Sequence, residues 1–380
     1  MRAVVVGAGP GGASAALALA KAGAGVELVD KAVWPRAKTC GDGVSPLAIA
    51  ELRQLGAAFA PGLRLRQARV STPGGTEFRG AWPQATPWGT IVERRNFDAA
   101  LVDAAIDAGA RFSPATRARA IAPSGHGVAV TVTAGGAERE LHADVAVVAE
   151  GAQGSLAKAL GFPPYRSRVV AIRAYARTHR RLPAEYGLFY DRFVSPGYGW
   201  IFPVDEGRAN VGVCVDERVL ARSGGNLRAL LHRWLRENHV ARGLFDEDPA
   251  LEDERGGLIP SGRGRRSRGH VFLVGDAAGV ADPFTAEGIY EAIKSGRLVA
   301  QALTESSDVD EARTRYERDL RSLDRNEHAA RALRTTFSVC IEPYARYAAR
   351  HPAFADRLMT DVFFAKPHWA KFLWGLHLGH

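Results

Sequence analysis

The sequence predicts a mixed α/β (α+β) fold with at least two domains, and three observations support this prediction. Residues 1–30 contain an apolar run, a glycine-rich turn, the helix-forming run ASAALALAKAG and a second apolar strand at Val26–Val29. Residues 161–257 alternate apolar and polar side chains, as the strands of an antiparallel sheet do. The chain has 380 residues, which is more than the roughly 250–300 at which a single hydrophobic core stops growing.

The glycine-rich turn has the spacing Gly7-x-Gly9-x-x-Gly12, and the second strand ends on Asp30. Gly7 allows a tight turn, Gly9 lets a diphosphate approach the backbone, and Gly12 lets the helix pack close to the first strand. The free N–H groups and the dipole of the helix N-terminus favour the same diphosphate. A βα turn without a ligand is the alternative, but the strand, the helix and the carboxylate together favour a dinucleotide site.

A later segment, Val271–Gly288, indicates which dinucleotide is bound. It contains an apolar strand that ends in Gly275-Asp276, and a helical stretch begins at Gly288. A second GxGxxG turn, which NAD-linked flavin reductases usually carry, is absent from the sequence. The Asp276 carboxylate suits a hydroxyl of a ribityl chain, and the following helix N-terminus can stabilise anionic reduced flavin. These features, together with the N-terminal turn, predict FAD.

With these motifs in place, the chain resembles the flavoproteins that have the p-hydroxybenzoate hydroxylase fold. Within them it is most similar to the geranylgeranyl reductase family, which includes the menaquinone reductases. The resemblance is carried by VVVGAGPGGASAALALAKAG, WPRAKTCGDGVSPLAIAELRQLG (34–56), ERRNFDAAL (93–101), YGWIFP (198–203) and GDAAGVADPFTAEGIYEAIKSG (275–296). It implies an FAD-binding Rossmann-like domain, an interleaved antiparallel substrate domain and C-terminal helices.

The turn motifs and the resemblance together define the candidate site residues. The candidate FAD contacts are Gly7, Gly9, Gly12, Asp30, Lys31, Arg36, Cys40, Gly41, Arg94, Gly151, Gly275, Asp276, Gly288 and Ile289. The candidate catalytic residues are Cys40, Asp42, Tyr198 and Trp200. No metal is expected, because the three cysteines show no metal-ligand spacing.

Two positions depart from the pattern of the family. The family's Asp-Gly at the end of the second flavin segment is Glu150-Gly151 here, and its Gly-Glu-Gly at the flavin-facing helix is Ala286-Glu287-Gly288. Each change adds bulk near the cofactor.

The resemblance implies a reductase that saturates carbon–carbon double bonds of a hydrophobic, polyprenyl substrate. The alternative is an FAD-dependent monooxygenase that hydroxylates an aromatic metabolite, and a third possibility is a flavoprotein that carries a lipid without turnover. Halogenation is disfavoured, because the chain has YGWIFP in place of the halogenase WxWxIP motif. It also has no lysine between Lys38 and Lys158.

Reduction of an isolated alkene needs a nearby acid, and Cys40, Asp42 and Tyr198 are the candidates. Alternation along YGWIFP places Tyr198, Trp200 and Phe202 on one face of a strand. From the pattern alone this strand is more typical of a core. The resemblance favours a wall of an apolar tunnel.

The motifs predict a discontinuous organisation. Residues 1–66, 93–160 and 258–310 are expected to form the FAD-binding domain, and residues 67–92 and 161–257 the substrate-binding domain. The first part of the substrate domain, RVSTPGGTEFRG, reads as a hairpin. Residues 311–380 are expected to form a C-terminal helical region.

The net charge of +9 is spread along the chain and does not predict a nucleic-acid partner. Its densest cluster, Ser261–His270, is interpreted as a solvated loop. Contact with an anionic partner, such as a membrane surface or a diphosphate substrate, is the open alternative. The expected partners are a hydrophobic or lipid substrate and an external electron donor (NADPH, a ferredoxin or a deazaflavin). The N-terminus is read as the first sheet strand, and no transmembrane run is found. A cytoplasmic protein is therefore expected, with peripheral membrane contact through the aromatic segment Val362–His380 as an open alternative to packing on the protein.

Overall fold

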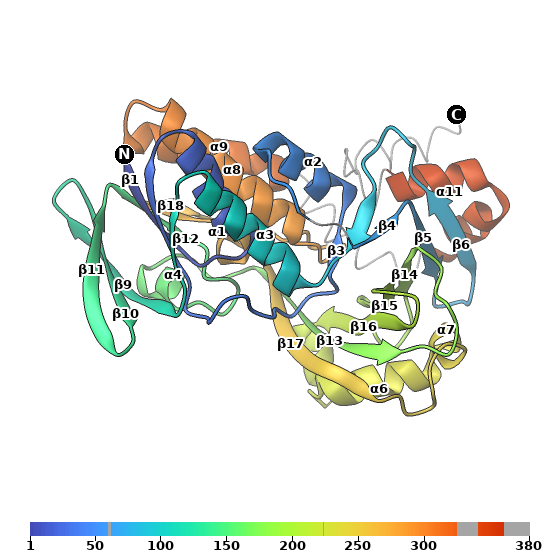
Figure 1. Ribbon diagram of the computed structural model, residues 1–380. Helices are drawn as coiled ribbons and strands as arrows, with labels where there is room; N and C mark the ends of the chain where they lie inside the picture. The colour runs from blue at the N-terminus through green and yellow to red at the C-terminus, as the bar shows by residue number, and fades with distance from the viewer. Residues whose placement is uncertain (60–61, 223, 325–340, 361–380) are drawn as a thin grey trace.

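The computed structural model describes residues 1–59, 62–222, 224–324 and 341–360. It confirms the mixed α/β fold, since two large sheets occupy different halves of the molecule (Figure 1). The first is six-stranded, and the second is seven-stranded. The described part of the chain contains no helix that is both long and apolar enough to cross a membrane.

The six-stranded sheet contains the glycine-rich turn. Its order is β18-β19-β12-β1-β2-β8, and all neighbouring pairs except β18–β19 are parallel. The strands are β1 (Arg2–Val6), β2 (Gly25–Val29), β8 (Arg111–Ser113), β12 (Val145–Val148), β18 (Ser267–Arg268) and β19 (Val271–Leu273). The carboxyl ends of β1, β2, β12 and β19 therefore meet at one edge, which is where open α/β sheets bind their ligands.

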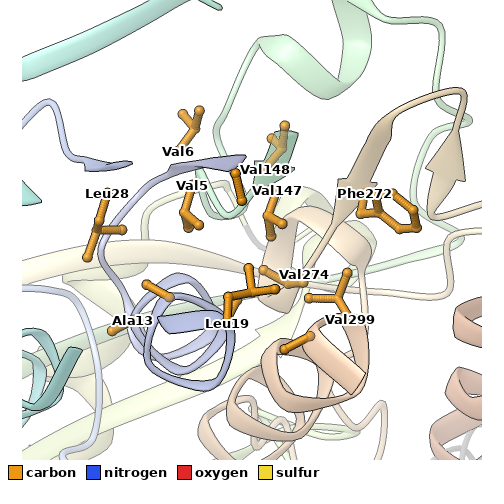
Figure 2. Close-up of a cluster of buried hydrophobic side chains, with 14 of the residues drawn as sticks. Val5, Val6, Ala13, Leu19, Leu28, Val147, Val148, Phe272, Val274 and Val299 are labelled. Atoms are coloured by element: carbon orange, nitrogen blue, oxygen red, sulfur yellow. The ribbon is translucent and has the colours of Figure 1, made fainter. Parts of the chain in front are cut away.

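Helices α1 (Pro10–Lys21) and α8 (Ile289–Glu305) pack together against this sheet. Their close approach needs small residues, because a Cβ on Gly296 would lie 2.3 Å from the Gly11 carbonyl oxygen. Figure 2 shows the core between these two helices and the sheet, in which Leu19 and Val299 pack with valines of β1 and β12. The other elements of this half are α2 (Pro46–Leu55), α3 (Arg94–Asp107), α4 (Leu156–Ala159), η1 (Gly275–Ala278) and α9 (Val309–Asp324), with the sheet of β9 (Thr116–Ser124), β10 (Gly127–Ala134) and β11 (Ala137–Ala143).

The seven-stranded sheet has the order β17-β13-β16-β15-β14-β5-β6. Its strands are β5 (Gln67–Ser71), β6 (Glu77–Ala81), β13 (Ser167–Arg177), β14 (Tyr186–Phe189), β15 (Tyr198–Pro203), β16 (Arg208–Asp216) and β17 (Leu251–Ser261). All neighbours are antiparallel except β5 and β14. The hairpin predicted in residues 67–92 is confirmed as β5–β6.

The two faces of this sheet serve different purposes. One face packs on Trp234 and Leu231 of α6 (Leu227–Glu237), through Val211, Val213 and their neighbours. The opposite face carries the tyrosines and tryptophan described below.

Three short helices and a small sheet complete the described structure. The helices are α5 (Glu217–Arg222), α7 (His239–Arg242) and α11 (Pro352–Leu358), and α11 packs on β6. The small sheet contains β3 (Gly43–Val44), β7 (Gly89–Ile91) and β4 (Leu63–Leu65).

Helix α3 begins at Arg94, so this arginine lies in the first turn of the helix. One expectation is corrected by the structure. The cluster Ser261–His270 is not a solvated loop, because Arg263 and Arg266 are 5% and 4% exposed. Both donate to backbone carbonyls, of Pro163 and Ala278 respectively, and so brace the fold. The segment Val362–His380 lies outside the described residues.

Candidate active site

A cavity of about 760 Å³ lies between the two sheets. Its wall includes residues from both sheets and from the loops that join them. All but one of the candidate FAD contacts line it, together with three of the four candidate catalytic residues: Gly7, Gly9, Asp30, Lys31, Arg36, Cys40, Gly41, Arg94, Gly151, Tyr198, Trp200, Gly275, Asp276, Gly288 and Ile289. Gly12 lies behind the turn, where a Cβ would come within 1.8 Å of the Gly7 carbonyl oxygen.

The N-terminus of α1 forms the phosphate-binding end of the cavity. Gly7 has φ +103, and a Cβ there would lie 2.3 Å from the carbonyl oxygen of Ala149. Gly9 caps α1 without a side-chain hydrogen bond, and the first turn of the helix has no acidic residue. The helix therefore presents backbone amides and a positive dipole end, which is the donor set that a diphosphate needs.

Asp30 is fixed beside this turn. Its Oδ2 accepts from the backbone N–H of Ala8 at 2.8 Å, and its Oδ1 accepts from that of Ala32 at 2.8 Å. The carboxylate is 6% exposed and lines the cavity. Each oxygen has a second lone pair, so Asp30 can also accept a ribose hydroxyl.

Two arginines in the wall are held by one buried carboxylate. Arg94 donates to Asp98 from Nε and Nη2 at 2.7 and 2.8 Å, and Arg36 donates to the same side chain at 3.1 Å. Burial lowers the pKa of Arg94, but Asp98 and Cys40 outweigh it and leave the pKa raised. The Arg94 guanidinium thus stays charged in the wall of the cavity.

The far end of the flavin site is formed by η1 and the start of α8. Asp276 lies in η1, and a Cβ on Gly288 would lie 3.5 Å from its Oδ1. Among the described residues, none forms a hydrogen bond with the Asp276 carboxylate. This carboxylate is therefore available to a ligand hydroxyl.

Both departures from the family pattern are accommodated locally. Glu150 points its carboxylate at the start of α4, where it accepts from the backbone N–H groups of Leu156 and Ala157. Ala286 adopts φ +57, a left-handed conformation that costs a non-glycine residue roughly 1–2 kcal/mol.

The other half of the cavity is an aromatic wall, defined here as Tyr186, Tyr190, Tyr198, Trp200 and Phe202. Neighbouring rings of the wall lie 5.2–6.3 Å apart between centroids. All five line the cavity, and the alternation expected for YGWIFP places the three β15 residues on this side. The wall is also core, since Trp200 is only 6% exposed.

The wall is closed by the turn that contains Cys40. A Cβ on Gly41 would come within 3.1 Å of Phe202 and 3.2 Å of Trp200. The turn therefore lies flat on the rings because it has glycine at this position. This contact brings the Cys40 segment and the YGWIFP segment, which are far apart in sequence, into one site.

Two of the three candidate acids are in the cavity wall. Burial raises the pKa of the Cys40 thiol, against the opposing effect of Arg94, so the thiol is protonated at neutral pH. Tyr198 donates its hydroxyl hydrogen to the carbonyl of Thr285 at 2.5 Å. Cys40 is thus a protonated side chain in the cavity wall, whereas the hydroxyl hydrogen of Tyr198 is already donated.

Asp42 differs from the other two candidate acids in its position. It is fully buried and does not line the cavity. Its Oδ2 accepts from Tyr175 Oη at 2.6 Å and from Asn210 Nδ2 at 2.8 Å. Burial raises the pKa of Asp42, and these two donors oppose the rise. The carboxyl is therefore held behind the cavity wall by Tyr175 and Asn210.

The motifs of the sequence did not identify several residues of the site. The alternation of side chains along the strands could have identified them. Val211, Val213 and Val215 face α6, so Asn210 and Cys214 must face the cavity side. The same rule applied to β13 gives Ala171, Arg173 and Tyr175. No comparable signal pointed to Asp98, whose role depends on the fold of α3.

Part of the chain matches a known family profile. The profile of the FAD binding domain matches residues 1–179. Together with the phosphate-binding turn and the cavity, it defines the protein as an FAD-binding flavoprotein.

Relatives extend the match. A menaquinone reductase of Mycobacterium tuberculosis is 34% identical over 322 residues, which cover 79% of this chain and 76% of the relative. A digeranylgeranylglycerophospholipid reductase of Methanopyrus kandleri is 30% identical and covers 81% of both chains. The chain belongs to the geranylgeranyl reductase family.

Solved structures agree on the fold. A geranylgeranyl bacteriochlorophyll reductase-like protein from Thermoplasma acidophilum superposes with a TM-score of 0.82, at 20% identity, and covers 99% of this chain and 98% of the other. A flavin-dependent brominase gives a TM-score of 0.79 at 21% identity, with 99% and 98% covered. At these identities the likeness shows the fold alone, which reductases and halogenases share.

Proposed function

We propose that the protein uses FAD to saturate carbon–carbon double bonds of a hydrophobic, polyprenyl substrate. One observation carries the proposal: the aromatic wall and the flavin motifs line a single cavity of about 760 Å³. An aromatic wall favours a long apolar chain over a small polar molecule. The names of the relatives, which are reductases of menaquinone and of geranylgeranyl lipids, support the same class of substrate.

Each part of the cavity has a task in this reaction. When bound and reduced, FAD would supply a hydride, which is two electrons and one hydrogen, to the first carbon of the double bond. The turn at Gly7–Gly9 and the arginine pair held by Asp98 bind the cofactor. The aromatic wall binds the prenyl chain and excludes water from the reacting carbons.

We assign the proton of the second carbon to Cys40. The thiol lines the cavity, and its raised pKa keeps it protonated at neutral pH. Tyr198 is the alternative donor, but its hydroxyl hydrogen is already given to the Thr285 carbonyl. Trp200 orients the chain as part of the wall.

The second candidate function is hydroxylation of an aromatic metabolite. The observation that favours it is the fold, since a p-nitrophenol monooxygenase from Pseudomonas putida superposes with a TM-score of 0.73 at 18% identity over 99% of this chain. Incubation of the reduced enzyme with prenyl quinones and prenyl lipids, with and without oxygen, separates the two. A product that gains two hydrogens without oxygen supports the reductase. A product that gains an oxygen atom supports the hydroxylase.

An external donor must reduce the flavin, and NADPH is our first candidate. A smaller cavity of about 230 Å³ shares Lys38, Arg94, Arg173 and Arg255 with the large one. Its lining also contains Glu93 and Asp253, but basic residues outnumber these two acidic ones. An excess of positive charge suits the phosphates of a donor that docks transiently. Anaerobic reduction of the flavin by NADPH, but not by a reduced ferredoxin or a reduced deazaflavin, would support this choice.

We also propose that the protein is cytoplasmic and contacts the inner face of the membrane peripherally, because its proposed substrates dissolve in lipid. Flotation with lipid vesicles tests this. Recovery of the protein only in the vesicle-free fraction would contradict the contact.

A further inference from the structure

Asn210 is a wholly buried asparagine on β16, next to the cavity but outside its lining. In the sheet it lies opposite Phe202 of β15 on one side and Tyr175 of β13 on the other. A buried amide needs partners for its two hydrogens and its oxygen, because an unsatisfied polar group costs roughly 1–3 kcal/mol.

All of these partners belong to two segments of the site. Asn210 Nδ2 donates to the Cys40 carbonyl at 3.0 Å and to Asp42 Oδ2 at 2.8 Å. Asn210 Oδ1 accepts from Trp200 Nε1 at 2.9 Å. The amide orientation is unambiguous, since an indole N–H can only donate and a carbonyl can only accept.

The turn that Asn210 holds needs support. Asp42 has φ +62, a left-handed conformation that a non-glycine residue adopts at a cost. Glycines flank it at positions 41 and 43, so the turn has little stiffness of its own. Asn210 and Tyr175 are the side chains that hydrogen-bond the Asp42 carboxyl.

We propose that Asn210 is a positioning residue: through one amide it holds the Cys40 turn and the Trp200 indole in a fixed relation. The thiol of Cys40 and the indole then face the same part of the cavity. The effect of Asn210 on catalysis rests on the proposed reductase function. The positioning of the Cys40 turn does not depend on that function and can be measured by the reactivity of the Cys40 thiol.

The test compares Asn210→Ala with the matched control Asn238→Ala in the FAD-loaded protein. Asn238 is also buried, donates to Asp191 and accepts from the N–H groups of Val240 and Ala241, and it lies at α7 on the opposite side of the sheet. The readouts are the rate of iodoacetamide modification at Cys40, located by peptide mass spectrometry, and kcat and KM with a prenyl quinone.

We expect Asn210→Ala to raise the modification rate of Cys40 by about tenfold, since the turn loses two hydrogen bonds. The value of kcat/KM per bound flavin should fall by a similar factor. Asn238→Ala should lower the melting temperature and leave both readouts unchanged. Trp200→Phe removes the indole N–H that Asn210 accepts, together with part of the ring. It should raise the Cys40 rate by a smaller factor, and it decides the question if Asn210→Ala does not fold.

A Cys40 modification rate that stays within twofold of the wild-type rate in the Asn210 and Trp200 variants would overturn the proposal. Absence of prenyl reduction in the wild-type protein would instead contradict the proposed function. The thiol measurement would still decide the role of Asn210.

Discussion

At the scale of single residues, the charged side chains of the cavity differ in whether they already have hydrogen-bond partners within the protein. Arg94 and Asp30 are bonded to buried or backbone partners, and they keep their places without a ligand. Asp276 has no recorded side-chain partner among the described residues, although it lines the cavity. A ligand that satisfies Asp276 should therefore gain binding energy from it.

The first prediction concerns this carboxylate. Asp276→Ala should weaken FAD binding by about ten- to a hundredfold, because a hydrogen bond to a charged group contributes roughly 1.5–3 kcal/mol. Titration of apoprotein with FAD, followed by flavin fluorescence, measures the change. Asp246→Ala is the control, since Asp246 is 73% exposed and lies away from the cavity. Equal affinities in the wild type and Asp276→Ala would show that Gly275-Asp276 is only a turn.

The second prediction concerns Asp42 and pH. Burial raises the pKa of Asp42 in the folded state, so the native protein keeps a proton that the unfolded chain releases above about pH 4. This proton contributes fully to the free energy of unfolding when the pH is below the pKa of Asp42 in the unfolded chain. The contribution is lost as the pH rises. Asparagine does not titrate and tolerates the left-handed conformation.

The wild type should therefore lose stability relative to Asp42→Asn as pH rises above the unfolded pKa of about 4. Thermal unfolding of both proteins at a series of pH values from below this pKa to neutral measures the difference. A difference that stays constant, or changes in the opposite direction, would mean that Tyr175 and Asn210 outweigh burial.

At the scale of elements, β15 has two faces with different roles. Trp200 lines the cavity, and Ile201 packs in the core under α6. Trp200→Leu should keep FAD and change turnover or chain-length preference. Ile201→Val should lower stability by about 0.5–1.5 kcal/mol and leave turnover per bound flavin unchanged.

Thermal melting and steady-state kinetics on both variants check this pair. If Trp200→Leu melts far lower and the surviving fraction has normal activity and chain-length preference, the strand is a core element and not a substrate wall.

The sequence was most informative where one local pattern determines one local structure. The turn at Gly7–Gly12 and the hairpin β5–β6 could be predicted, because spacing and alternation specify them. The course of β15 followed from period-two alternation. The interpretation of Arg263 and Arg266 as solvated failed, because their burial depends on carbonyls far away in the chain. The burial of Asp42 could not be predicted for the same reason, since its partners lie on β13 and β16.

At the scale of the whole molecule, the cavity depends on two sheets that are each assembled from distant segments. We propose the domain limits 1–66, 93–160 and 258–310 for the FAD-binding domain, and 67–92 and 161–257 for the substrate domain. The composition of the two sheets supports this division, although β17 continues past residue 258. The described part of the C-terminal region contacts both halves, through α9 on α8 and α11 on β6.

The central claim is that the reduced flavin in this cavity reacts with a carbon–carbon double bond rather than with oxygen. Anaerobic mixing of the photoreduced holoenzyme with a prenyl quinone, followed by flavin absorbance and product mass, tests it most directly. The account predicts that oxidised flavin returns without oxygen, with one double bond saturated for each flavin. Flavin that stays reduced until oxygen is admitted, with a product that then gains an oxygen atom, would contradict it.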